Sequence, residues 1–336
     1  MTDNSFSLPV ADLHCDLLSY LVHFPTADLN TLEDIGASLP HLKAGNVKIQ
    51  VLAMFSLSQP GSVDFVRRQA QKFVELSQSK DFTAIHSVAL ARNAATAGTV
   101  GIIPAIENAS GLCEADEPIS MAFQRLEEII DTTGRILYLG LTHHTENRFG
   151  GGNFSDNIGL KPDGEALLEY LHGRQICIDL AHTSDALAYD ILDVITKKSL
   201  DIPVIASHSN FRPVCDHVRN LPDELTKEII DRKGLIGINF LRAYVDEENP
   251  RKLFDHILYG KSISYAGRAA LAFGADFFSI RDFPDSTRYP LFFPEHENAS
   301  KYPEVLKDLT EHFHEEELAK RLAWDNVIDF LARIWK

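Results

Sequence analysis

A histidine and an aspartate stand two positions apart in a short apolar stretch near the start of the chain, residues 10–18. Residues i and i+2 of an extended strand project to the same face, so His14 and Asp16 can point at one spot. An imidazole nitrogen and a carboxylate oxygen are both ligands for a divalent metal ion. Cys15 would then face the other way and pack in the core. Because His-x-Asp pairs are common by chance, the meaning of this pair depends on what recurs later.

Carboxylates and histidines recur where later apolar runs end. A carboxylate is costly to bury unless it is paired or bound to metal, and the two oxygens of Glu107 could bridge two cations. His182 and His208 end consecutive runs and, as neutral imidazoles, suit a second metal ion, while Asp179 could orient a ligand from behind. The residues alone leave open a water-facing glutamate and two hydrogen-bonded structural histidines. The full set of run-ending residues is Glu107, His143, His182, His208 and Asp276.

Eight apolar, β-branched runs predict strands that are buried on both faces, as in a parallel sheet. They cover residues 10–16, 47–55, 100–107, 136–143, 175–182, 203–208, 235–240 and 270–276. Amphipathic patterns in most of the gaps predict helices, and Ser184 is a suitable N-cap for one of them. These helices span residues 64–79, 120–132, 163–171, 184–196 and 222–231, and residues 304–334 have the pattern of two more.

The alternation of strands and helices favours an α/β fold of the (β/α)8 type, a TIM barrel, in one domain over residues 1–336 with extra C-terminal helices. A doubly wound open sheet is the alternative. A barrel brings the C-terminal ends of all its strands to one mouth, whereas an open sheet would spread the run-ending polar residues across its width. A shared site therefore favours the barrel.

Composition narrows the class of partner and the compartment. A formal net charge of −16 disfavours non-specific binding to nucleic acid or to anionic membranes. The four cysteines show no paired spacing, which fits a reducing compartment. Residues 1–8 lack the basic start and apolar run of a signal peptide, and no apolar stretch reaches membrane-spanning length. We therefore expect a cytoplasmic protein that acts on a small molecule.

The motifs at these strand ends resemble, in order, those of the membrane dipeptidase (renal dipeptidase-like) family, peptidase family M19 of the amidohydrolase superfamily. The resemblance extends over nearly the whole chain. Its markers are Asp12-Leu13-His14-Cys15-Asp16, Pro104-Ala105-Ile106-Glu107, Leu141-Thr142-His143, Asp179-Leu180-Ala181-His182, Ser207-His208-Ser209, Arg219-Asn220-Leu221-Pro222-Asp223 and Gly274-Ala275-Asp276-Phe277. Each marker alone is weak, but the ordered set is specific.

The resemblance implies a site for two divalent metal ions, usually zinc, at the mouth of the barrel. It assigns His14 and Asp16 to one ion. The other ion takes His182 and His208, and Glu107 bridges the two. A hydroxide shared by the ions would attack the peptide carbonyl, because two cations lower the pKa of bound water and stabilise the oxyanion. No nucleophilic serine or cysteine is required.

The same resemblance gives roles to three further residues. Asp276 would take a proton from the attacking water and pass it to the leaving amine. His143 matches the histidine that polarises the substrate carbonyl, and its Leu-Thr-His context distinguishes it from the adjacent His144. Arg219 would hold the free carboxylate of a dipeptide with two parallel hydrogen bonds.

The sequence departs from the family pattern at three positions near the expected site. Asn108 and Ala109 stand where the family usually has two glycines, and Phe278 stands where many relatives have a second aspartate. These changes are expected to alter the fit of the substrate. A glycine-rich loop over residues 145–164 is expected to form a lid, and the aromatic stretch 289–293 either lines the pocket or covers the flank of the barrel.

These features together predict a zinc-dependent dipeptidase whose substrates include dipeptides with a C-terminal D-residue. One alternative is another hydrolase of the amidohydrolase superfamily, acting on a small amide, lactone or phosphoester. A non-catalytic metal-binding barrel is the other alternative, although the chain retains every expected ligand. The resemblance also makes a homodimer an expectation.

Overall fold

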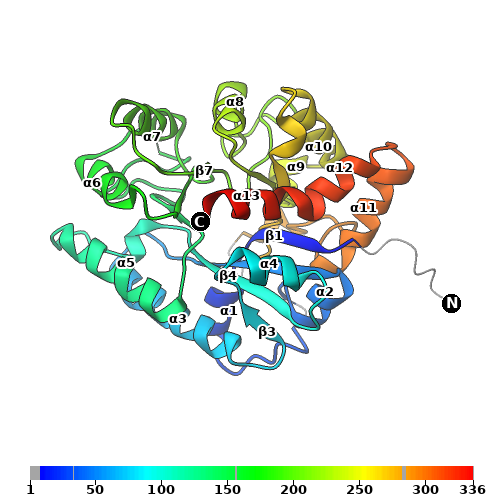
Figure 1. The fold of residues 1–336 in the computed structure, drawn as a ribbon, viewed down its shortest axis with the longest axis horizontal. Coiled ribbons are helices and arrows are strands. Elements are labelled where there is room, and N and C mark those ends of the chain that lie inside the picture. Colours follow the sequence, from blue (N-terminus) through cyan, green and yellow to red (C-terminus); the bar gives the residue numbers. More distant parts are fainter. Residues whose placement is uncertain (1–7, 33, 156, 282–284, 336) are drawn as a thin grey trace.

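Eight short parallel strands form a nearly closed barrel that helices surround (Figure 1). The computed structural model describes residues 8–32, 34–155, 157–281 and 285–335. The barrel strands are β1 (Val10–Cys15), β2 (Val47–Met54), β4 (Val100–Ile106), β5 (Tyr138–Gly140), β6 (Cys177–Asp179), β7 (Val204–Ile205), β8 (Ile236–Ile238) and β9 (Leu271–Phe273). They pair in the order β7-β6-β5-β4-β2-β1-β9-β8, and a bridge between Ala206 and Ile236 connects the two outer strands. The predicted TIM-barrel class and the eight predicted strands are confirmed.

One further strand, β3 (Phe82–Ala84), was not predicted. It lies outside the barrel order and pairs with β4, with Phe82 opposite Val100. Three residues that include the polar Thr83 are too few to show the apolar pattern of a buried strand.

The predicted helices are also confirmed, with shifts of at most two residues at their ends. Ser184 caps α7 as expected, because its side chain accepts a hydrogen bond from the Leu187 N–H. The α-helices are α1 (Leu17–His23), α2 (Leu39–Ala44), α3 (Ser62–Ser77), α4 (Val88–Ala94), α5 (Ser120–Thr133), α6 (Pro162–Leu171), α7 (Asp185–Lys197), α8 (Asp223–Asp231), α9 (Arg242–Val245), α10 (Lys252–Ser262), α11 (Tyr302–Glu311), α12 (Glu316–Lys320) and α13 (Asn326–Ile334). Within the described ranges, no helix has both the length and the apolar character to cross a membrane.

Short helical turns complete the chain: η1 (Ala109–Gly111), η2 (Gly267–Ala269), η3 (Ser286–Arg288), η4 (Ala299–Lys301) and the π-helical η5 (Arg321–Asp325). The C-terminal segment differs in detail from the expected pair of helices. It contains α11, followed by α12, η5 and α13 in direct succession.

Helix α13 closes one end of the barrel. Its Phe330 and Leu331 belong to the same buried cluster as Leu13, Val51 and Ile103 from the barrel strands. In Figure 1, α13 lies across the middle of the barrel. This packing buries the apolar stripe of α13 and leaves the opposite end, where the polar strand ends lie, as the mouth.

Two glycines let three backbone segments meet behind the mouth. A Cβ atom at Gly237 would lie 1.9 Å from the Ser207 carbonyl oxygen, and one at Gly274 would lie 2.0 Å from the same oxygen. Side chains at these positions would therefore push β7, β8 and β9 apart at the point from which His208 and Asp276 extend.

We expect Gly237→Ala to lower the free energy of unfolding by about 2 kcal/mol, because the added methyl group overlaps rigid backbone. Gly98→Ala is the matched control, since a Cβ atom there would have no atom within 4 Å. Urea denaturation followed by circular dichroism measures both. Equal midpoints for the two variants would contradict the close packing of these strands.

Candidate metal centre

The five predicted metal ligands meet at the mouth of the barrel, around the carboxylate of Glu107. Its Oε1 atom lies 2.9 Å from Nε2 of His182 and 3.8 Å from Nε2 of His208. Its Oε2 atom lies 3.7 Å from Nε2 of His14. Oε1 thus faces His182 and His208 and Oε2 faces His14, which is the arrangement that a bridging carboxylate requires.

Asp16 reaches the site from just beyond β1. Its Oδ1 atom lies 4.0 Å from Nε2 of His14. The backbone at Asp16 has φ −95° and ψ 27°, so the chain has already turned toward α1. The two side chains therefore meet as expected, although Asp16 itself is not part of an extended strand. Cys15 between them is fully buried in the core, in agreement with the packing role that we expected.

The charge state of these groups fits a cation site. His14 Nε2, Asp16 Oδ1 and Glu107 Oε2 are buried atoms that have no hydrogen-bond partner within the described part of the chain. Burial raises the pKa of Asp16 and of Glu107 well above the usual range, and nearby carboxylates raise it further. Burial also lowers the pKa of His182 and His208, which keeps their rings neutral and their lone pairs available. Such a set of carboxylates and neutral imidazoles matches the ligand preferences of zinc and similar divalent ions.

Hydrogen bonds behind the histidines fix the orientation of their rings. The hydroxyl of Tyr138 lies 2.7 Å from Nδ1 of His14 and donates to the carbonyl oxygen of Leu13. With Nδ1 protonated and donating to this hydroxyl, Nε2 of His14 keeps its lone pair for the site.

His208 has a similar support. Its Nδ1 atom lies 2.6 Å from Oγ of Ser207, and this hydroxyl donates to the carboxylate of Asp179. Asp179 therefore orients a ligand, as its sequence position suggested, but the ligand is His208 on the next strand. The sequence did not reveal Tyr138 or Ser207, because a hydroxyl in or next to an apolar run gives no indication of its partner.

Asp276 and His143 complete the mouth. Oδ1 of Asp276 lies 3.7 Å from Nε2 of His14, and Oδ2 accepts a hydrogen bond of 2.9 Å from Nδ2 of Asn239. Burial raises the pKa of Asp276 to about 6. Asp276 also has a φ of 65°, an unfavourable backbone conformation for a non-glycine residue and one that clusters at functional sites. His143 extends from the end of β5, with Nε2 3.7 Å from Oε1 of Glu107.

Arg219 brings a buried positive charge to the same place. Its guanidinium donates to Oγ of Ser209 and to the carbonyl oxygen of His208, and one of its nitrogens lies 3.3 Å from Nε2 of His182. Its Nε atom has no hydrogen-bond partner among the described residues. A buried guanidinium with an unused donor is suited to an anionic group of a ligand.

The positions that depart from the family pattern have structural partners. Asn108 caps η1 by accepting a hydrogen bond from the Ser110 N–H, and its amide donates to the carbonyl oxygen of Ser56. Asn147, in the long loop, donates to Asn108. Phe278 packs against Phe292, with ring centroids 5.6 Å apart. Asn108 thus fastens the loop to the barrel, and Phe278 joins an aromatic cluster on its flank.

The glycines of the long loop allow close packing against the site. A Cβ atom at Gly152 would lie 2.0 Å from the carbonyl oxygen of His143. Gly152 also forms a bridge with Thr183, and the Asn153 N–H donates to the carbonyl oxygen of His182. These contacts explain why glycine is needed at position 152, and the role of the loop as a lid stays a prediction.

Comparisons with known proteins identify a family and similar folds. A family model described as membrane dipeptidase (peptidase family M19) matches residues 5–336. A metallo peptidase from Rhodobacter sphaeroides, liganded with a phosphinate mimic of the dipeptide L-Ala-D-Ala, has a TM-score of 0.80 at 20% identity, covering 98% of this chain and 100% of that chain. The probable dipeptidase PvdM from Pseudomonas aeruginosa has a TM-score of 0.78 at 16% identity, covering 98% and 96%. The phosphotriesterase from Mycobacterium tuberculosis is less similar, with a TM-score of 0.54 at 15% identity, covering 97% and 95%.

We expect Tyr138→Phe to weaken metal binding about 10- to 100-fold, because His14 loses the hydrogen-bond partner that orients its ring. Competition with a chelator measures the affinity. Tyr189→Phe, on the exposed side of α7, is the control and should bind metal like the wild type. Wild-type affinity in Tyr138→Phe would show that this hydroxyl does not support the metal centre.

Proposed function

Because this chain belongs to the membrane dipeptidase family, peptidase family M19, and is by that membership a metallo-dipeptidase, we propose that it hydrolyses dipeptides with two zinc ions at the barrel mouth. The observation that carries the proposal is that the two carboxylate oxygens of Glu107 face different histidines. His14 and Asp16 would hold one ion. His182 and His208 would hold the other, with Glu107 between the two.

A pair of divalent ions at this site would lower the pKa of an attacking water and stabilise negative charge on the carbonyl oxygen. Asp276 would accept the proton of that water and return it to the leaving amine. Its burial raises its pKa to about 6, a value suited to proton transfer in both directions near neutral pH. Asn239 holds the other oxygen of the Asp276 carboxylate and so fixes its orientation.

His143 and Arg219 would position the substrate. Burial lowers the pKa of His143, so its ring is neutral and can donate one N–H to the developing oxyanion. Arg219, buried beside His182 and His208, would bind the C-terminal carboxylate of the dipeptide. This contact would select substrates whose free carboxylate lies one residue from the scissile bond.

Dipeptides with a C-terminal D-residue are included in the proposal. The dipeptide mimic bound to the Rhodobacter sphaeroides protein has this configuration, and the match to that protein covers 98% of this chain. A direct comparison of L-L and L-D dipeptides tests this part separately from hydrolysis itself.

We expect about two divalent ions per chain, and we expect chelation to abolish dipeptide hydrolysis and added zinc to restore it. Elemental analysis gives the ion count, and release of free amino acids from L-L and L-D dipeptides gives the activity. The same panel contains a lactone, a simple amide and a phosphoester. A zinc-loaded protein that leaves the dipeptides intact, or that turns over the lactone or phosphoester instead, would contradict the proposal.

We expect Asp276→Asn to retain the metal ions and to lower kcat by at least about 10²-fold, because the amide cannot accept the proton. Asp231→Asn, at an exposed position of α8, is the control and should keep wild-type kcat. Metal content and kcat are measured on the same samples. Near-wild-type turnover by Asp276→Asn with full metal content would exclude the proton-transfer role.

A further inference from the structure

We infer that Arg288 forms a second carboxylate subsite at the mouth, so that this protein prefers dipeptides whose C-terminal residue has an acidic side chain. The inference rests on the proposed function, since it assumes that Arg219 binds the main-chain carboxylate of a dipeptide. It goes further by naming the substrate class and the residue that selects it.

An arc of aromatic rings leads outward from the metal centre. The ring of His144 lies 5.1 Å from that of His182 and 4.8 Å from that of Phe154. The ring of Phe154 lies 6.2 Å from that of His217, which in turn lies 4.8 Å from that of Tyr244. The arc therefore runs from a predicted metal ligand to Tyr244, and the exposed side chain of Phe154 marks its outer edge.

Two guanidinium groups meet at Tyr244. Cζ of Arg219 lies 5.6 Å from the centroid of the Tyr244 ring. Burial raises the pKa of Tyr244, and Arg219 and Arg288, from η3, both act against that rise, so both positive charges lie near this tyrosine. A ligand held by Arg219 against this ring would lie on the side of the mouth that carries Arg288.

The charge of Arg288 also reaches the arc. Burial lowers the pKa of His217 most, Arg219 lowers it further, and Arg288 adds to this effect. Arg219 and Arg288 thus both bring positive charge to this side of the mouth, in a protein whose formal net charge is −16.

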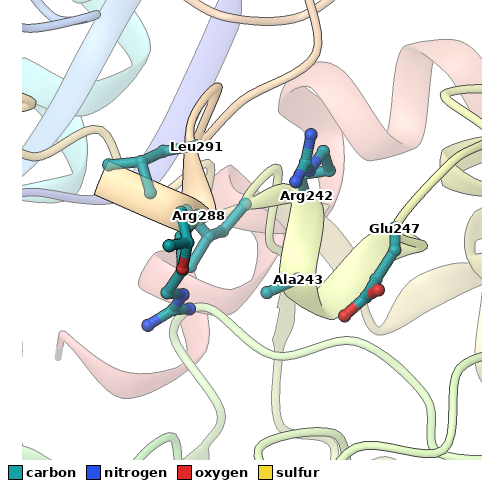
Figure 2. Close-up of a pocket in the computed structure, with 7 residues that line it drawn as sticks. Arg242, Ala243, Glu247, Arg288 and Leu291 are labelled. Carbon is teal, nitrogen blue, oxygen red and sulfur yellow. The ribbon is translucent and has the colours of Figure 1, made fainter. Parts of the chain in front are cut away.

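A pocket of about 240 Å³ opens beside Arg288 (Figure 2). Leu241 and Leu291 line it, and the Leu241 N–H donates to Oδ1 of Asn239, the residue that holds Asp276. In Figure 2, Arg288 and Glu247 lie on either side of Ala243, so the Glu247 carboxylate is not next to the Arg288 guanidinium.

These features suit a carboxylate on a short aliphatic stem. The leucine side chains would contact the methylene groups of an aspartyl or glutamyl side chain, and the guanidinium would bind its carboxylate. The main-chain and side-chain carboxylates of one acidic residue are a few bonds apart, which fits two arginines that share one tyrosine. A neutral amide of the same shape would lack the charge-assisted hydrogen bond.

The test compares kcat/KM for matched pairs that differ only in that carboxylate: L-Ala-L-Glu with L-Ala-L-Gln, and L-Ala-D-Glu with L-Ala-D-Gln, all with zinc-loaded protein. We expect the wild type to prefer the acidic member of at least one pair by about tenfold. Arg288→Gln should remove most of this preference, chiefly through a higher KM for the acidic substrate. Arg288→Lys should retain part of it, because the charge remains.

Arg242→Gln is the matched control. Arg242 lines the same pocket, but its guanidinium points away from that of Arg288 (Figure 2), so this variant should keep the wild-type preference. Hydrolysis of the amide substrates with no preference for the acidic ones, or a preference that Arg288→Gln leaves intact, would overturn this inference alone. No hydrolysis of any dipeptide by the zinc-loaded wild type would overturn the proposed function and this inference with it.

Discussion

Three carboxyl groups crowd into one buried space at the mouth of the barrel, and the rest of the site depends on how their repulsion is balanced. Burial raises the pKa of Asp16 and of Glu107, and the nearby Asp276 carboxylate raises both further. Burying three carboxyl groups together in the ionised form is unfavourable unless positive charge nearby compensates for theirs. Arg219 supplies one positive charge, and the neutral histidines supply lone pairs rather than charge. Divalent cations are the natural complement, and the rigid strand ends keep the carboxyls together.

Hydrogen bonds behind the ligands hold the two predicted ion sites in place. The hydroxyl of Tyr138 supports His14, and the hydroxyl of Ser207 supports His208. Asp179 anchors the second of these by accepting from the side chain and the N–H of Ser207. The two histidines, which belong to different predicted ions, are therefore each oriented by a hydroxyl behind the ring.

The barrel could be predicted because each strand is an apolar run that ends in a polar residue. Residues 100–106, for example, are followed directly by Glu107. The ligands could be predicted because parallel strands bring such ends together. Features that depend on contacts across the barrel could not. The partner of the Tyr138 hydroxyl is on a strand distant in sequence, and Asn147, which connects the long loop to Asn108, is 39 residues further along the chain. The four-residue α9 is too short to show a helical period. The sequence therefore did not predict α9 or the position of Arg288 beside it.

The packing of α13 against the inside of the barrel affects how the chain can acquire its structure during synthesis. Phe330, Leu331 and Trp335 fill the end of the barrel opposite the mouth, against residues as early as Leu13. While these last side chains are still inside the ribosome, the interior of the barrel is open to water at that end. Domains tend to fold as units as they emerge, so β1 cannot be fully packed until residues 330–335 have emerged. Cellular factors that shield exposed apolar surface would therefore be needed longest for the first strand, which also carries His14.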